Sequence, residues 1–280
     1  MALATSTVDA VTAAITRRAD LRTRLHADHT DCYRLFHGIA EGEPGLTIDR
    51  YGTLLLAQTF RSPLTHDEAD ELGDVVRGAT ALDLPFCCNH RGELPPGFPT
   101  HEPPLPALDE HIAHEHGAAF VIRARHRGQD PWLFLDLRPA RQRIRDLALG
   151  RAVLNLFAYT CGVGIVAALG GARSVLNIDF ATSALAVGTH NAARNGIGSD
   201  RFQVLQSDCI PVLRQLAGLQ REFSLQGMPE HVVVGRARGH RRPADAGQSE
   251  QARAPIEDAA GGAKSRQLDL KGSGQGQSRS

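Results

Sequence analysis

The order of apolar and polar positions predicts both helices and strands in the first half of the chain. Residues 7–28 carry apolar side chains near helical spacing and predict one helix. Its basic flank is expected to be a solvated face formed by Arg17, Arg18, Arg22 and Arg24. Short β-prone runs separated by glycine turns predict a small antiparallel meander at residues 33–39, 46–49 and 53–60.

A helix is expected over 67–79, after that meander. The proline-rich stretch at 94–106 cannot form a central strand, and a further hairpin is expected near residues 111–125 and 132–135. The sequence therefore predicts an N-terminal helix over 1–29, followed by a small α+β domain over 30–135.

After residue 138, apolar strands alternate with amphipathic helices. The predicted strands lie at 152–157, 174–178 and 201–206. The predicted helices lie at 138–149, 162–169, 181–195 and 210–216. Alternation at this spacing predicts right-handed crossovers and a parallel sheet. We interpret 136–235 as an α/β domain, with a fourth strand expected to begin at 231–234.

Composition separates the last part of the chain from the rest. Residues 236–280 contain nine Lys or Arg against five Asp or Glu, and their large apolar side chains are only Ile256, Leu268 and Leu270. So little apolar surface cannot offset the entropy of ordering, which predicts a disordered tail. The tail has no aromatic residue to stack on bases, so a solvated tail is favoured over an RNA-binding one.

Cysteine and histidine spacing gives little sign of a disulfide or metal site. The five cysteines are an odd number without metal-ligand spacing. The histidines at 111, 114 and 116 would not share one face of a strand, so no metal is expected. The longest apolar stretches are far shorter than the roughly 20 residues of a spanning helix, and we expect a cytoplasmic protein without a membrane partner.

Candidate chemistry gathers where the predicted strands end. Residues 153–164 run from a buried strand through a glycine-containing turn into a helix. The second strand ends in Asp179, a carboxylate that can accept both hydroxyls of a ribose, and the third is followed by Asp208 and Cys209. Because ligands bind at the carboxyl ends of parallel strands, these three strand ends predict an adenosine site.

The turn distinguishes between two adenosine cofactors. A dinucleotide fingerprint places its first glycine directly after the strand, whereas residues 158–161 precede Gly162 here. A nicotinamide cofactor is therefore disfavoured. A longer turn carrying Asn155, Phe157, Tyr159 and Thr160 suits S-adenosylmethionine, which has no pyrophosphate to seat on a helix N-terminus.

Three runs carry a resemblance to a known family. The runs at 133–141 and 153–162, LFLDLRPAR and VLNLFAYTCG, resemble class I S-adenosylmethionine-dependent methyltransferases related to the large-subunit rRNA cytosine-C5 methyltransferases. Residues 33–52 resemble the start of that family's small α+β domain. The resemblance implies a Rossmann-like catalytic domain, an rRNA substrate, and cofactor contacts at Asn155, Phe157, Tyr159, Gly162, Asp179 and Asp208. It also places 134–138 beside that pocket.

Two departures from the family's pattern bear on activity. The family has an Asp-Pro-Pro motif after its fourth strand, and this sequence contains none. Neither Cys161 nor Cys209 maps to the family's nucleophilic thiolate, and we interpret both as small buried residues. Our hypothesis is that residues from about 220 onward are an out-of-frame or degenerate end, and we expect weak or absent methyl transfer. The alternatives are a cofactor-binding remnant without catalysis and, third, an NAD-dependent oxidoreductase.

Overall fold

The computed structural model describes residues 2–98, 109–125 and 130–219. The chain divides into two units, Met1–Gly235 and Arg236–Ser280, and every described residue belongs to the first. The expected disordered tail, the expected fourth strand and the hypothesis of an out-of-frame end fall outside the described residues. Within those residues, no helix combines the length and apolar character needed to cross a membrane.

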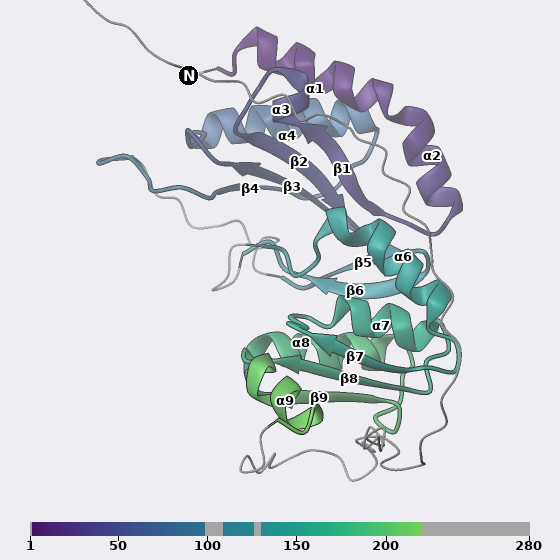
Figure 1. Ribbon diagram of the computed structural model, residues 1–280. Coiled ribbons are helices and arrows are strands. Elements are labelled where there is room, and N and C mark those ends of the chain that lie inside the picture. Colours follow the sequence, from purple (N-terminus) through teal and green to yellow (C-terminus); the bar gives the residue numbers. More distant parts are fainter. Residues whose placement is uncertain (1, 99–108, 126–129, 220–280) are drawn as a thin grey trace, which may run out of the picture. The chain divides into compact units, whose positions relative to one another are not determined.

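The first sheet has the strand order β1-β2-β3-β4 (Figure 1). Its strands are β1 (Cys32–His37), β2 (Leu46–Tyr51), β3 (Leu54–Thr59) and β4 (Phe86–His90). The first three form the predicted antiparallel meander. β4 was not predicted; it pairs with β3 in parallel, and α4 (His66–Thr80) forms the crossover between them. A capping box between Thr65 and Glu68 starts that helix and satisfies its first free amides.

The predicted N-terminal helix is two helices, α1 (Thr5–Arg17) and α2 (Ala19–Ala27). The expectation that their basic flank is solvated was wrong for two of its four arginines, Arg18 and Arg22, whose side chains are half-buried. Both Arg17 and Arg18 form ion pairs with Glu41, in the short helix α3 (Gly38–Glu41). Arg22 donates to the carbonyl of Thr80 at 2.7 Å, where α4 ends. These arginines attach the N-terminal helices to the sheet domain.

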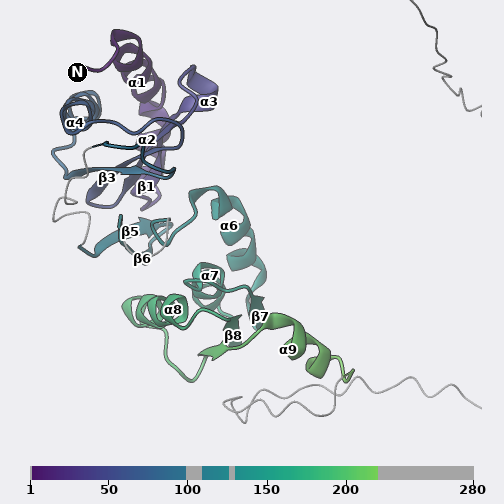
Figure 2. The same cartoon turned by 90° about the vertical axis from the view of Figure 1, so that its left-hand side faces the viewer.

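Each face of the first sheet has its own apolar core. One face packs against α1 and α4 through a cluster that includes Ile15, Leu72, Ile48 and Leu55 (Figure 2). The opposite face contributes Leu54 and other buried residues to the larger core, which continues into the second half of the chain. The sheet is therefore buried on both sides.

A two-stranded hairpin joins that larger core. Its strands are β5 (His111–Glu115) and β6 (Ala118–Ile122), so the expected hairpin lies entirely within 111–125. The expectation of a strand at 132–135 was wrong: the chain there is irregular and enters a 3₁₀ turn at Leu135–Leu137. A side chain from later in the sequence holds residues 132–135 in place instead: the Thr160 hydroxyl donates to the carbonyl of Trp132 at 2.6 Å.

Buried polar groups fix the hairpin on both sides. Glu115 is 2% exposed and binds Arg141 of α6 (Arg138–Leu147) through two hydrogen bonds of 2.6 and 2.8 Å. Arg138 adds a third bond of 2.9 Å to the same carboxylate. On the other strand, Asn195 bonds both the amide and the carbonyl of Ala119, at 2.9 and 2.7 Å. The Asn195 side chain thus forms hydrogen bonds with backbone groups of β6 that none of the described strands satisfies.

The second sheet is the predicted parallel one, in the order β7-β8-β9. Its strands are β7 (Ala152–Leu156), β8 (Ser174–Asp179) and β9 (Phe202–Gln206). The helices α7 (Gly162–Leu169) and α8 (Thr182–Arg194) cover one face, and α9 (Cys209–Leu216) packs on the other (Figure 2). This arrangement confirms the predicted strand–helix alternation. The boundary predicted between residues 135 and 136 stays a prediction.

Candidate cofactor site

The carboxyl ends of the three parallel strands meet at one edge of the second sheet. Leu156 pairs with Ile178, and Asp179 pairs with Gln206, so the segments that follow these residues are neighbours. Because parallel strands expose their carboxyl ends on the same side, the β7–α7 turn and the acids Asp179 and Asp208 come to this edge. The arrangement of the three strand ends is the one expected from the sequence.

The β7–α7 turn is strained at every second residue. Phe157, Tyr159 and Cys161 have φ angles of 52°, 50° and 60°, in the left-handed region that residues other than glycine rarely adopt. Each such residue costs roughly 1–3 kcal/mol and persists only where its surroundings enforce it. Such strain concentrates at functional sites, and the sequence gives no sign of it because none of the three is glycine.

Neighbouring groups enforce this turn through its backbone amides. The Tyr159 amide donates to Asp179 Oδ2 at 2.8 Å, and the Ala158 amide donates to the carbonyl of Ile178 at 3.0 Å. The Phe157 amide lies 3.3 Å from Cys209 Sγ. The turn is therefore bound to both the second strand and the start of α9, and its shape is set before any ligand arrives.

Asp179 both supports the turn and faces the site. Its side chain is buried, with the residue 5% exposed, and Oδ1 accepts from the Ala181 amide at 2.9 Å while Oδ2 accepts from Tyr159. Two bonds leave lone pairs on both oxygens, because a carboxylate offers about four acceptor positions. The carboxylate can thus accept further hydroxyl donors without giving up its backbone partners.

The remaining predicted contacts differ in their surroundings. Asp208 caps α9 by accepting from the Ile210 amide at 2.9 Å and is otherwise open to solvent. Gly162 begins α7 with free space beside it, since an added Cβ would meet no atom closer than 3.8 Å. Asn155 lies beneath the turn, where its Nδ2 donates to Asn177 Oδ1 at 2.9 Å. Asn155, like Asp179, is buried, at 8% exposure.

Tyr159 connects the turn to the segment before α6. Its hydroxyl donates to Asp130 Oδ1 at 2.6 Å, and its ring lies 5.7 Å from that of Phe134. Burial, followed by the Asp130 hydrogen bond and charge, raises the pKa of the Tyr159 phenol, which therefore stays protonated as a donor. This contact places Phe134 beside the turn, whereas Asp130 was not foreseen; the position of 134–138 beside the cofactor stays a prediction.

Two exposed aromatic rings follow adjacent strands. Phe157 is 65% exposed after β7, and Phe180 is 74% exposed after β8. A large apolar ring left in water at a ligand-binding edge offers a stacking surface for a planar base. Phe157 was predicted from the sequence and Phe180 was not, although the position of Phe180 directly after Asp179 was a usable signal.

The two cysteines near the site are buried and lack the properties of a nucleophile. Burial, with a smaller effect of the Asp179 charge, raises the pKa of the Cys161 thiol to about 12. A thiol in that state is almost entirely protonated at neutral pH. Cys209 is 3% exposed and faces the Phe157 amide. Both positions agree with the interpretation of small buried residues.

A parallel sheet with a glycine-containing turn after its first strand and acids at the ends of the next two is the arrangement that the resemblance to class I S-adenosylmethionine-dependent methyltransferases implies. Residues 101–221 match the model of the family described as S-adenosylmethionine-dependent methyltransferase. The predicted resemblance is therefore confirmed.

Several sequence relatives carry the name ribosomal RNA large subunit methyltransferase I. The protein of Erwinia tasmaniensis is 30% identical over 227 residues, covering 76% of this chain and 56% of the relative. That of Shewanella amazonensis is 31% identical over 202 residues, covering 69% and 49%. This chain thus spans about half the length of the curated relatives it matches.

Two solved structures described as methyltransferases share the fold. One, SMU.776 complexed with SAH, has a TM-score of 0.62 at 23% identity and covers 75% of this chain and 55% of that chain. The other, from Streptococcus mutans, has a TM-score of 0.61 at 22% identity and covers 77% and 56%. These likenesses confirm the predicted Rossmann-like α/β fold.

Proposed function

We propose that this chain binds S-adenosylmethionine at the edge formed by the ends of β7, β8 and β9, and that it methylates rRNA. The observation that carries the proposal is the strained β7–α7 turn bound to the Asp179 carboxylate, inside the region that matches the methyltransferase family. The names of the relatives support RNA as the substrate.

The residues at this edge fit the adenosine portion of the cofactor. Asp179 has acceptor positions left for ribose hydroxyls, and the rings of Phe157 and Phe180 offer apolar surface for adenine. Asp208 offers a free carboxylate oxygen, and the open space at Gly162 allows close approach to the backbone. S-adenosylmethionine, when bound, supplies an electrophilic methyl group.

Isothermal titration of the full chain with S-adenosylmethionine, its demethylated product and NAD tests the binding. Asp179→Asn should weaken cofactor binding by about 1–3 kcal/mol, roughly 5- to 150-fold, because a buried acceptor position is lost. Asp146→Asn, which removes a carboxylate exposed on α6, should bind as the wild type does. Thermal unfolding without cofactor shows whether Asp179→Asn retains its fold.

Three outcomes would contradict the proposal. A wild-type chain that binds neither S-adenosylmethionine nor its product would refute it, and binding of NAD alone would favour the oxidoreductase. Equal affinity in a folded Asp179→Asn variant would remove Asp179 from the site. Methyl transfer to large-subunit rRNA, followed with a labelled methyl group, then tests the substrate; the expected weak transfer stays a prediction.

A further inference from the structure

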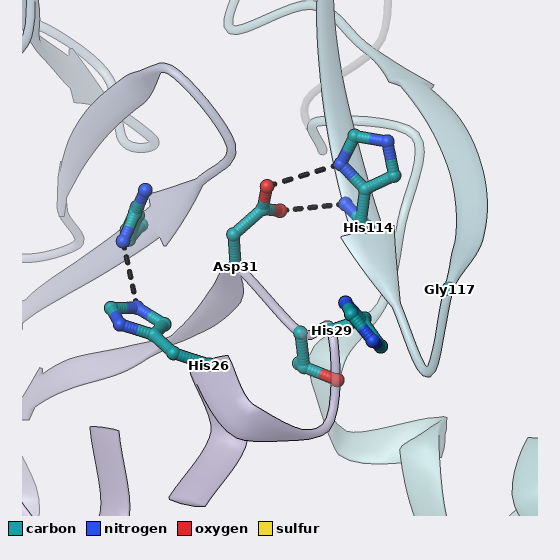
Figure 3. A pocket seen from close by; sticks show the side chains of 7 residues that line it. His26, His29, Asp31, His114 and Gly117 are labelled. Atoms are coloured by element: carbon teal, nitrogen blue, oxygen red, sulfur yellow. Dashed lines mark hydrogen bonds and ion pairs between the residues drawn. The ribbon is translucent and has the colours of Figure 1, made fainter. Parts of the chain in front are cut away.

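A second polar pocket lies among α2, β1, β2 and the β5–β6 turn, and it shares no residue with the cofactor site. Its volume is about 550 Å³. Figure 3 shows His26 on one side and His29, His114 and Gly117 on the other, with Asp31 between them. Thr30 and Arg50 complete the lining.

Arg50 supplies a fixed positive charge to this pocket. Its Nε donates to the carbonyl of Gly52 at 2.9 Å, and its Nη1 donates to His26 Nε2 at 2.8 Å. The guanidinium also lies 5.8 Å from the centre of the Tyr33 ring. Among the described residues no carboxylate forms an ion pair with Arg50, so its charge is held in place without being neutralised.

His26 is a neutral donor beside that charge. Because an arginine only donates, Nε2 of His26 must accept, which leaves the proton on Nδ1. Burial, and then the charges of Arg50 and Arg22, lowers the pKa of His26 and keeps the ring neutral. The pocket therefore receives an N–H donor from His26 in addition to the guanidinium.

The Asp31 carboxylate of the pocket is already bonded to His114. Asp31 Oδ1 accepts from the His114 amide at 2.6 Å, and Oδ2 lies 3.1 Å from His114 Nδ1. Figure 3 shows both contacts directed toward His114. Asp31 thus orients His114 through Nδ1, and the second ring nitrogen, Nε2, is left for another partner.

His29 adds a ring that makes no contact of its own. Its φ is 51°, a left-handed backbone conformation, and its carbonyl accepts from the Gly117 amide at 3.1 Å. Within the described ranges the His29 ring has no hydrogen bond or ion pair. A strained residue that presents an unused polar ring to a pocket is a feature typical of ligand sites.

We propose that this pocket binds a phosphate group of an RNA strand. A tetrahedral anion with several acceptor oxygens matches a planar guanidinium flanked by two imidazoles that can donate, those of His26 and His29. The volume exceeds that of a phosphate and leaves room for the attached sugar. A metal ion fits less well, because Arg50 would repel it and no group of three or more potential ligands among the described residues could hold one. RNA as the source of the phosphate rests on the proposed function; the phosphate itself does not.

Fluorescence polarisation with a labelled 12-nucleotide RNA tests the proposal on the full chain, without S-adenosylmethionine. Arg50→Gln should weaken binding roughly tenfold, because a charge-assisted contact is lost. It should also reduce the slope of log K against log salt by about 0.7, the contribution of one phosphate of a single strand. Arg24→Gln is the matched control, since it removes the same charge from an exposed position on α2 and should bind as the wild type does.

His29→Gln separates ligand binding from folding. Its ring supports no other residue within the described ranges, so thermal unfolding should be unchanged while RNA affinity falls severalfold. Uridine 5′-monophosphate and inorganic phosphate, added as competitors, identify the source of the phosphate. If the oligonucleotide binds far more tightly than the nucleotide, the ligand is RNA. If the two bind alike, the ligand is a free nucleotide. Wild-type affinity in both Arg50→Gln and His29→Gln would overturn the proposal, whatever the result with S-adenosylmethionine.

Discussion

Replacing Gly164 by alanine tests how tightly α7 packs against the second sheet. A Cβ atom at this position would lie 2.0 Å from Asn177 Oδ1, closer than real Cβ atoms approach. Asn177 is fully buried and bound at both ends: Oδ1 accepts from Asn155 at 2.9 Å, and Nδ2 donates to the carbonyl of Gln203 at 3.1 Å. The alanine variant must therefore move a side chain that has no free direction.

The expected cost follows from what Asn177 can do. If the side chain stays and is compressed, overpacking costs about 1–3 kcal/mol. If it turns away, a buried polar group loses a partner at a cost of about 1–3 kcal/mol. Exchanging glycine for alanine inside a helix returns roughly 0.5–1 kcal/mol. We expect the free energy of unfolding to fall by about 1–2 kcal/mol, which lowers Tm by roughly 2–8 °C in a domain of this size.

Urea unfolding followed by tryptophan fluorescence measures this change, because Trp132 is the only tryptophan of the sequence. Its carbonyl accepts from Thr160, so the signal reports on the site itself. Gly162→Ala is the matched control in the same helix turn, since its nearest neighbour is 3.8 Å away, and it should be as stable as the wild type or more so. Equal stability of Gly164→Ala and the wild type, or equal losses in both variants, would refute the packing argument.

Two further predictions concern buried and half-buried charges. Glu115→Gln should lower the free energy of unfolding, measured in urea, by about 3–5 kcal/mol, because Arg141 stays buried without its partner. Glu110→Gln, at an exposed ion pair, should lower it by at most about 1 kcal/mol. Similar losses in the two variants would contradict this prediction. Burial tends to raise the pKa of Glu41, but bonds from the His37 amide and Arg18 outweigh it and lower that pKa below its usual 4.5. The resulting stability is present above pH 4.5 and is lost as the pH falls through the lowered pKa, so unfolding midpoints measured from pH 6 to 3.5 should decline less in Glu41→Gln.

The strands of the second sheet could be predicted because each is a short β-prone run with a Val-Leu pair, and the segments between them have helical periodicity. β4 could not, since its run of Phe, Cys, Cys, Asn and His has neither alternation nor a uniform apolar character. The stretch at 132–135 is β-prone by composition, but contacts from Tyr159 and Thr160 hold it in an irregular conformation. Those contacts join residues that are far apart in the chain, and local patterns do not encode them.

In the candidate site, too, some features could be predicted from the sequence and others could not. The order of the strands along the sequence was sufficient to predict that Asp179 and Asp208 lie at one edge of the sheet, because the topology of a parallel sheet fixes where its strand ends lie. The left-handed residues of the turn and the Tyr159–Asp130 bond were not predictable, since both depend on the packing of distant segments. Asn155 as a cofactor contact stays a prediction; its side-chain amide donates to Asn177 Oδ1, the atom that a Cβ at position 164 would meet.

The β5–β6 hairpin also determines the order in which this chain can fold. Its bonds connect residues 83 positions apart at Asp31 and His114, and 76 apart at Ala119 and Asn195. Contacts between residues so distant in the chain form late, so we expect the hairpin to dock after both sheets have begun to form. A cut between residues 135 and 136 would separate Glu115 from both of its arginines, so neither fragment is expected to unfold as the intact chain does. Calorimetry of the intact chain should therefore show one cooperative transition across both sheets.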